Sequence, residues 1–459
     1  MKRTALVFAV IIFVLVLLIP IIGNSFMQNI INENVKVLEK NGLILQSQRD
    51  DENYFYSRKH FEFRVQNVDE FLKYLKSYTK TPVSSSFYNI LRSGVIASDV
   101  EYSNIPFSKS ITMEVYPLSL SKKLMNQMKQ TDVQAFEHLK NFLQAKGILY
   151  HIDYNLLSKD FNGFIKDIND KYTFKDNQKI AMVLQNVRFN GEGELFSPSR
   201  FEISVDKVYL SMNKGSEKLF ANIDNFKSSS NLQSLYERTS DTKIYTCNIS
   251  IHSPKGNLDV SMKDMETSLS STLQNGRVNM HFKNYIDTFK FDTPKMWFAL
   301  NDLNSEVAIK NLHKEKLAEF SHLLTISKTI AKSQFQKEMQ KSLLALLSHG
   351  LNVRVKDVSI GDITINKTED LGSMKIFADL KMKEDKDLTN KFQASSKKLL
   401  DDLQMQAKIK LANALFLKLI EESPMAQVMV SYAKKDADAF YFDIVFRNAK
   451  LMINDKYIQ

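Results

Sequence analysis

A histidine and a carboxylate lie close together at one point of the chain, where they could share a proton. His151 and Asp153 belong to Ile148 to Tyr154, a segment in which apolar and polar residues alternate. Alternation predicts a strand, and residues two apart on a strand project from the same face. The pair could therefore place an imidazole beside a carboxylate, the combination that proton transfer uses. The same spacing is also typical of an ordinary surface contact, which is the reading we prefer.

Other residues with chemical potential are isolated or badly spaced. His313 and His322 are nine apart on one predicted helix and point to nearly opposite sides at about 100° per residue, so they cannot chelate a metal together. Cys247 is the single cysteine and cannot form an intrachain disulfide. Gly191-Glu192-Gly193 lies between predicted strands with no helix after it, which predicts a turn and not a phosphate loop. The sequence thus predicts no catalytic residue, no cofactor and no metal.

The N-terminal segment has the features of a membrane anchor. Thr4 to Asn32 contains no charged residue, and Ala5 to Ile22 is apolar except for Pro20. At about 1.5 Å per residue such a run matches a bilayer core of about 30 Å. We predict an anchor over residues 1–24, whose apolar side chains include Ala5, Phe8, Ile12, Leu15, Leu18 and Ile22. A cleaved signal peptide is the alternative, although its apolar region is usually shorter, about 7 to 15 residues.

Charge predicts the orientation of this segment. Lys2 and Arg3 precede the apolar run, and the first charge after it is Glu33. Cationic residues are retained on the cytoplasmic side, so we expect the N terminus inside and the rest of the chain on the non-cytoplasmic side, beside the lipid bilayer. The net charge of +10 comes from lysines interleaved with Asp and Glu, without a basic stripe, and predicts no nucleic-acid partner.

The remaining chain predicts an α+β fold: a single N-terminal transmembrane helix followed by large twisted antiparallel β-sheets covered by a few long amphipathic helices. Short strands separated by turns fill residues 173–298, and long helices are predicted over residues 312–348 and 387–422. A helix over residues 118–145 is predicted to break at Thr131, which would cap the second half. We expect an α+β lobe (25–170), an antiparallel β region (171–305) and a C-terminal α+β lobe (306–459).

One order of elements occurs twice. A predicted helix ends at Gly147 and is followed by an alternating strand, and about 200 residues later a second helix ends at Gly350 before Leu351 to Val358, which alternates in the same way. The recurrence suggests two related lobes.

The C-terminal half resembles a known family. Leu346-Leu347-Ser348-His349-Gly350, followed by Asp357-Val358-Ser359-Ile360, resembles the YdgA-like family of bacterial envelope proteins, a domain of unknown function. Lys450 to Tyr457 is similar to that family's terminal strand-turn-strand, with Asp455 where the family usually has glycine. The resemblance implies an inner-membrane-anchored periplasmic protein of a Gram-negative cell, and it brings no catalytic residue.

Three functions are consistent with these features. The first is a non-enzymatic binding or scaffolding module that engages another envelope protein. The second is a lipid-binding or lipid-transfer module, because 31 Phe and 17 Tyr could line an apolar β-groove suited to phospholipid acyl chains. The third is a hydrolase whose site is not recognisable from the sequence.

Overall fold

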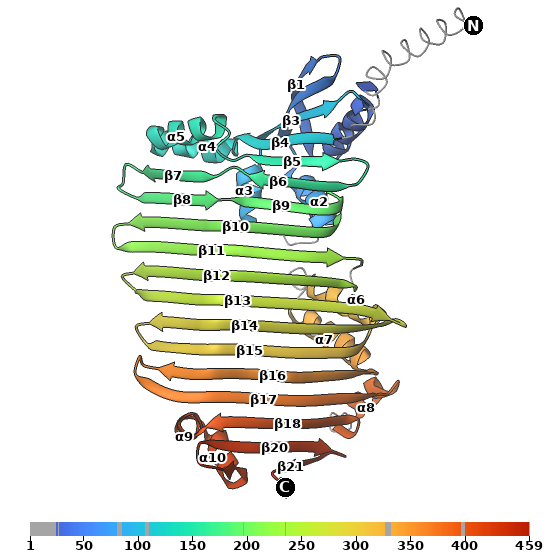
Figure 1. The fold of residues 1–459 in the computed structure, drawn as a ribbon, viewed down its shortest axis with the longest axis vertical. Helices are drawn as coiled ribbons and strands as arrows, with labels where there is room; N and C mark the ends of the chain where they lie inside the picture. Colours follow the sequence, from blue (N-terminus) through green and yellow to red (C-terminus); the bar gives the residue numbers. More distant parts are fainter. Residues whose placement is uncertain are drawn as a thin grey trace, which may run out of the picture. The chain divides into compact units, whose positions relative to one another are not determined.

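The computed structural model describes eight stretches of the chain. They are residues 24–25, 27–79, 85–105, 110–195, 197–234, 236–325, 332–395 and 400–458. Contacts divide the chain into two compact units, Met1–Gly215 and Ser216–Gln459, which we call unit 1 and unit 2. Strands account for 59% and helices for 25% of the structure (Figure 1).

Unit 1 is an antiparallel meander. Its strands are β1 (Leu43–Glu52), β2 (Tyr56–Val65), β3 (Val95–Ser103), β4 (Ser110–Ser119), β5 (Tyr150–Asn155), β6 (Asp160–Ile165), β7 (Ile168–Thr173), β8 (Lys179–Gln185), β9 (Val187–Glu194) and β10 (Ser197–Lys214). Its labelled helices are α2 (Val68–Thr79), α3 (Ser85–Leu91), α4 (Lys122–Thr131) and α5 (Val133–Gln144). Each of the strands β1 to β5 pairs with the next one in the chain, whereas β6 pairs with β9.

The second half of this sheet is built from strands that lie end to end. Strand β10 pairs with β9 through its first residues and with β8 through its last. Only Asn186 separates β8 from β9, and it has a φ of 52°. Asn tolerates this left-handed conformation better than most residues, so one long strand can bend at this point without losing its register.

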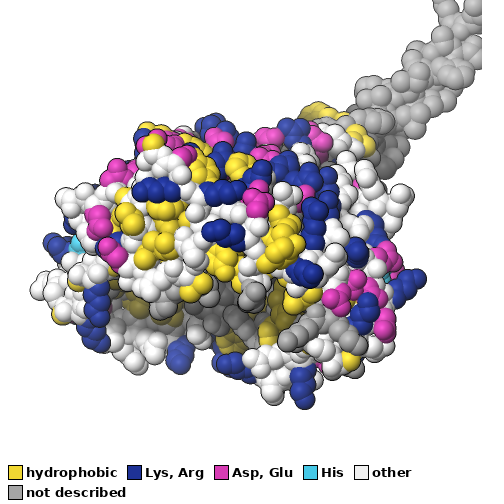
Figure 2. All heavy atoms as spheres, turned by 90° about the horizontal axis from the view of Figure 1, so that it is seen from below, with side chains coloured by type: hydrophobic (Ala, Val, Ile, Leu, Met, Phe, Trp, Pro, Cys, Tyr) yellow, Lys and Arg dark blue, Asp and Glu magenta, His cyan; other side chains and the backbone are white. Residues whose placement is uncertain are grey.

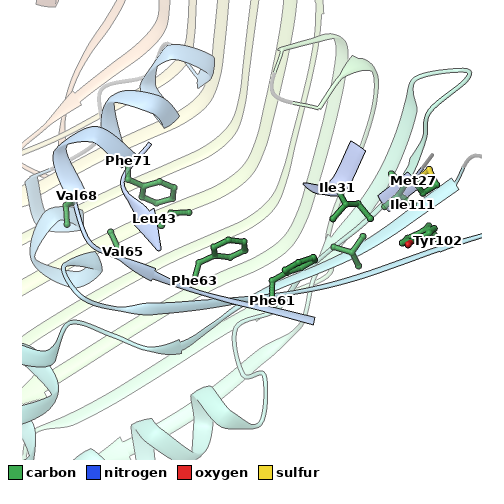
Figure 3. Packing of buried hydrophobic residues seen from close by; sticks show 11 residues of the cluster. Met27, Ile31, Leu43, Phe61, Phe63, Val65, Val68, Phe71, Tyr102 and Ile111 are labelled. Atoms are coloured by element: carbon green, nitrogen blue, oxygen red, sulfur yellow. The ribbon is translucent and has the colours of Figure 1, made fainter. Parts of the chain in front are cut away.

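The core of unit 1 follows the alternation of β2. Phe61, Phe63 and Val65 all point to one face and are at most 4% exposed. Helical residues 27–40 and α2 cover this face, with Met27 and Phe71 packed into the same cluster (Figure 3). Burial of such side chains contributes about 1.5–3 kcal/mol each and fixes which face of β2 is internal.

Two glycines of unit 1 face two phenylalanines across a strand pair. Gly163 of β6 is opposite Phe189 of β9, and Phe161 of β6 is opposite Gly191 of β9. A Cβ atom on Gly163 would lie 2.4 Å from the Phe189 ring, and one on Gly191 would lie 2.4 Å from the Phe161 ring. The predicted turn at residues 191–193 is therefore wrong: these residues continue β9, because Gly191 leaves space for an aromatic ring.

Unit 2 is a longer meander of consecutive antiparallel strands. They are β11 (Glu217–Leu232), β12 (Arg238–Ser253), β13 (Gly256–Gln274), β14 (Arg277–Thr293), β15 (Met296–His313), β16 (His349–Ile365), β17 (Glu369–Glu384), β18 (Leu403–Ala412), β19 (Lys434–Lys435), β20 (Ala439–Arg447), β21 (Lys450–Ile453) and β22 (Lys456–Tyr457). The helices are α6 (Lys314–Thr325), α7 (Lys332–Leu347), α8 (Leu388–Ala394), α9 (Asn413–Glu422) and α10 (Pro424–Met429), with a 3-10 turn at Val430–Tyr432.

Apolar residues change faces halfway along these long strands. In β14, Val278, Met280 and Phe282 occupy even positions, whereas Phe289 and Phe291 occupy odd positions. Successive residues of a strand point to opposite faces, so β14 presents apolar side chains on one face in its first half and on the other face in its second half.

The change of face occurs at one row that crosses five strands, which we call the aspartate row. The constant registers place its members opposite one another: Asn225, Tyr245, Asp264, Asp287 and Asp302. Three of them have left-handed backbones, with φ of 51° at Asn225, 47° at Asp264 and 50° at Asp302. Asn and Asp are the residues other than glycine that adopt this conformation most readily.

The two halves of the unit 2 sheet have different cover. One half of the sheet contains the residues of β14 that precede Asp287. In this half, Val278 and Met280 of β14 pack with Leu346 of α7. Met382 of β17 packs with Leu344 of α7 and Leu388 of α8. Helices α7 and α8 thus bury the apolar face of this half.

The predicted α+β fold with long covering helices is wrong. Residues 387–422, predicted as one helix, form α8, β18 and α9. Strand β18 reads Leu-Gln-Met-Gln-Ala-Lys-Ile-Lys-Leu-Ala, a strict alternation that favours a strand over a helix. The structure is dominated by antiparallel strands, and helices such as α6 and α7 contain only 12 and 16 residues.

The prediction of the fold also included a single N-terminal transmembrane helix, and this part of the prediction is corrected as well. Within the stretches that the structure describes, no helix combines the length and apolar character that crossing a membrane requires. The predicted anchor residues, from Lys2 to Ile22, lie outside the described stretches.

The repeated order of helix and strand is present in both units. Helices α4 and α5 connect β4 to β5, and α6 and α7 connect β15 to β16; in each case the two strands are antiparallel neighbours. The cap of α5 is Asp132 and not Thr131, because the Asp132 carboxylate accepts the Ala135 N–H at 3.0 Å.

Candidate functional site

The predicted pair of His151 and Asp153 lies in a row of charged side chains across unit 1. His151 Nε2 is 3.4 Å from the Asp153 carboxylate, and the imidazole stacks on Phe164 at 4.6 Å. Strand pairing places His60 opposite Asp99, Asp99 opposite Glu114, and Glu114 opposite His151. We call this row, with Lys146, the charged ladder.

Lys146 holds the centre of the ladder together. Asp99 and Glu114 are carboxylates directly opposite each other, an arrangement that repels. The Lys146 ammonium donates to both at 2.7 Å, and it reaches them from a residue with a φ of 52° just after α5. Burial opposes ionisation of Asp99, but hydrogen bonds from Lys146, His60 and Tyr116 lower its pKa below the usual value.

The ladder has the properties of a structural ion-pair network. Asp99 accepts hydrogen bonds from three side chains, which leaves it no role as a free base. Burial, and then the hydrogen bond to Asp99, raise the pKa of Tyr116 to about 12, so its hydroxyl stays protonated. Networks of this kind shift pKa values without catalysis.

Replacement of Lys146 tests the ladder. We expect Lys146→Met to lower the free energy of unfolding of unit 1 by about 2 kcal/mol, because hydrogen bonds to charged groups contribute about 1.5–3 kcal/mol and two like charges are left opposed. Urea denaturation followed by circular dichroism measures the loss. Lys140→Met is the control: the Lys140 side chain is 43% exposed, and its ammonium pairs with Glu137 at 3.6 Å. An equal effect of both variants would contradict the proposed role of Lys146.

His313 contacts a different histidine from the one considered in the sequence. It ends β15 before α6, and its ring lies 4.3 Å from that of His349, which begins β16 after α7. Arg277, opposite His313 in the sheet, donates to the His349 carbonyl at 2.9 Å. Burial first, and then the nearby His349 and Arg277, lower the pKa of His313.

The lowered pKa of His313 predicts a pH dependence. As the pH falls, the His313 imidazole takes up a proton near pH 6.5 in the unfolded chain, but only at lower pH in the folded chain. The contribution of neutral His313 to the free energy of unfolding of unit 2 is therefore complete above this pH and decreases as the pH falls below it. We expect the urea midpoint, followed by fluorescence of Trp297, the single tryptophan, to fall less between pH 7.5 and 5.5 in His313→Gln than in wild type. An equal fall of the urea midpoint in the two proteins would exclude His313 as a source of the pH dependence. Glu315 and Lys316 also act on this group and are unchanged in the comparison.

Unit 2 carries a continuous set of apolar side chains beside the aspartate row, which we call the apolar stripe. It consists of Leu219, Ala221 and Ile223 of β11; Cys247, Ile249 and Ile251 of β12; Leu258, Val260 and Met262 of β13; Phe289 and Phe291 of β14; Phe298 and Leu300 of β15; and Ile363 and Ile365 of β16.

Strand pairing makes the stripe continuous. One row passes from Ala221 through Ile249, Val260, Phe291 and Phe298 to Ile365, and each member is opposite the next. The rings of Phe291 and Phe298 stack at 5.3 Å. At about 4.8 Å between strands, six strands and three rows give an area of about 24 by 13 Å.

The stripe is covered at one end and open at the other. Ile363 and Ile365 pack against the cluster of Leu371, Leu415 and Phe416, which includes α9. Towards β12 the side chains are solvent-accessible, with Ile249 39% and Ile251 40% exposed.

Hydrophobic side chains also remain at the surface near the C-terminal elements. Leu417 of α9 is 54% exposed and Val428 of α10 is 64% exposed. Figure 2, which draws the molecule from the side of β20 and β21, shows hydrophobic groups between lysines and arginines.

The chemistry of the stripe is that of a binding surface. Cys247 is its one side chain that can ionise, and burial raises the pKa of this thiol, which keeps it protonated and unreactive. Elsewhere in the described residues, no three His, Cys, Asp or Glu side chains are grouped to hold a metal. The sequence analysis assigned a binding role to none of these residues, because the signal that groups them is a change of alternation phase at Asn or Asp within one strand.

The fold and this surface define a class: an antiparallel β-meander protein with an open apolar face. A model of the bacterial protein family of unknown function DUF945 matches residues 152–457. The chain therefore belongs to the DUF945 family. No curated protein and no solved structure matches it.

Proposed function

We propose that this chain is a non-enzymatic lipid-binding module of the bacterial cell envelope and that the apolar stripe holds acyl chains. The observation that carries the proposal is the open apolar surface across β11 to β15. Contiguous exposed apolar patches of about 300 Å² or more are often functional in soluble proteins.

The composition of the stripe favours hydrocarbon over a protein partner. Its members are Ala, Val, Ile, Leu, Met, Phe and one Cys, which offer almost no hydrogen-bonding groups. Protein interfaces contain about one hydrogen bond per 100–200 Å² and bury about 800 Å² per partner, more than twice the area of the stripe. The long dimension of about 24 Å exceeds one leaflet of hydrocarbon, about 15 Å, so an acyl chain fits within it.

The location in the envelope rests on sequence. Lys2 and Arg3 before an apolar run support export of the body, and the resemblance to YdgA-like envelope proteins supports the same place. Reporter fusions after Asn41 and at the C terminus should both be active only when exported. Cytoplasmic activity of either fusion would overturn the location.

A polar substitution in the stripe tests lipid binding. We expect Ile249→Asn to weaken acyl binding about 30-fold, because burying an amide without a partner costs about 2 kcal/mol. The measurement is photo-crosslinking with a phospholipid that carries a diazirine in its acyl chain, followed by mapping of the crosslinked peptides. Thr239→Asn, on the same strand beyond the aspartate row, is the control.

The outcomes separate the alternatives. Crosslinks to β11 through β15 that Ile249→Asn abolishes and Thr239→Asn retains support the proposal. Absence of crosslinks in this region, together with a protein that copurifies at fixed stoichiometry, would replace it with a scaffolding function.

A further inference from the structure

Three hairpin turns at one edge of the unit 2 sheet each carry a lysine. Lys255 lies between β12 and β13, Lys295 between β14 and β15, and Lys367 between β16 and β17. In a meander, alternate turns lie at the same edge and are two strand spacings apart, about 10 Å. The edge therefore presents lysines at regular intervals.

The first two of these turns are built alike. Each has a hydroxyl residue, a proline and a lysine, Ser253-Pro254-Lys255 and Thr293-Pro294-Lys295. The Ser253 hydroxyl accepts the Lys255 N–H at 3.2 Å, and the Thr293 hydroxyl accepts the Met296 N–H at 3.0 Å. A Cβ on Gly256 would be 3.6 Å from Pro294, so the turns are neighbours.

Lys255 and Lys295 supply net charge at this edge. Both are exposed, and neither has an ion-pair partner among the described residues. Three carboxylates nearby are engaged by other side chains. Asp292 binds Lys367 at 3.2 Å, Glu369 binds Lys418 at 3.4 Å, and Asp259, opposite Asp292, lies 3.0 Å from His252 Nε2. Glu217, at the start of β11, is followed directly by Lys218.

Exposed apolar residues lie beside these lysines. Met296, next to Lys295, is 51% exposed, and Ile251, two residues before Ser253, is 40% exposed. Ile251 belongs to the apolar stripe, so the stripe begins at this edge. Lysines next to exposed apolar side chains form the pattern of a surface that binds an anionic membrane.

We propose that this edge, which we call the lysine edge, docks on an anionic phospholipid surface and that acyl chains enter the apolar stripe from there. The inference rests on the proposed lipid-binding function, which it extends by naming the headgroup charge and the side of entry. Isolated lysines about 10 Å apart suit the diffuse charge of a membrane, where each contributes about a fivefold gain in binding.

A fluorescent probe at the lysine edge tests docking in the full chain. Met296→Cys in a Cys247→Ser background gives one labelling position for an environment-sensitive dye. The labelled protein is mixed with vesicles of phosphatidylglycerol or of phosphatidylcholine. We expect a blue shift of the dye emission and quenching by spin-labelled lipid in phosphatidylglycerol, and about 25-fold weaker docking when Lys255→Gln and Lys295→Gln are combined.

A matched pair of lysines provides the control. Lys227 and Lys310 are exposed, lack an ion-pair partner among the described residues and lie beyond the aspartate row. Lys227→Gln with Lys310→Gln should leave the probe signal unchanged. A dye that remains in water in phosphatidylglycerol, or an equal loss in both lysine pairs, would overturn docking.

Failure of docking and failure of lipid binding are distinguishable. If Ile249→Asn abolishes crosslinks while the dye never enters the bilayer, lipid binding stands and the entry side is wrong. If the dye responds to phosphatidylglycerol but no crosslink forms in the stripe, the proposed lipid-binding function fails.

Discussion

Phe416→Ala is expected to lower the free energy of unfolding of unit 2 by about 4 kcal/mol, the usual loss for a buried phenylalanine of about 3–5 kcal/mol. Phe416 is 2% exposed, and its ring lies 4.4 Å from Phe440 and 5.3 Å from Phe442. It anchors α9 against the sheet in the cluster that covers Ile363 and Ile365. Removal of the ring should therefore uncover the closed end of the apolar stripe as well as create a cavity.

The measurement is urea denaturation followed by fluorescence of Trp297, which lies in unit 2. Leu417→Ala is the matched control, because Leu417 is the next residue of α9 and is 54% exposed. Surface substitutions of this kind usually change stability by less than about 0.5 kcal/mol. A loss below about 1 kcal/mol for Phe416→Ala would mean that α9 does not rest on this ring.

Gly163→Ala is the second large effect that we expect, a loss of about 3 kcal/mol in unit 1. The added Cβ would lie 2.2 Å from the His151 carbonyl oxygen and 2.4 Å from the Phe189 ring. A ring can rotate, but a carbonyl in a paired strand cannot move without breaking the ladder between β5 and β6. The strain therefore falls on the backbone beside the charged ladder.

Hydrogen exchange of β5, β6 and β9 measures this loss locally. Asn162→Ala, at the preceding exposed position, should leave the exchange rates of these strands almost unchanged. Unchanged protection in Gly163→Ala would show that β6 and β9 are farther apart in solution than the structure places them.

Both predictions concern contacts between residues distant in the chain, where sequence reasoning was weakest. Alternation correctly predicted that His151 and Asp153 share a face of a strand, because that property depends only on the two-residue period. It did not predict Lys146, which reaches Asp99 from 47 residues away. The contact of His313 with His349 was likewise missed, since it requires the α6–α7 connection to return to the sheet.

Periodicity also gave wrong element boundaries where a strand lies within a segment that was predicted to be one long helix. Residues 403–412 alternate strictly but were predicted as the middle of a long helix. The phase changes at Asn225, Asp264 and Asp302 interrupt alternation within single strands and therefore look like the ends of short strands. The structure shows one strand on both sides of each of these residues.

The sequence by itself determined that this is a strand-rich chain with evenly spaced turns, one cysteine and no recognisable catalytic motif, because alternation, turn residues and motifs are local properties. Only the tertiary structure decided which side chains share a surface. The register between strands places apolar residues of β11 to β16 opposite one another, and they form the apolar stripe. In unit 1 the register likewise places histidines and carboxylates opposite one another, and Lys146 joins them in the charged ladder. Such surfaces depend on pairings between distant residues, which no local pattern specifies.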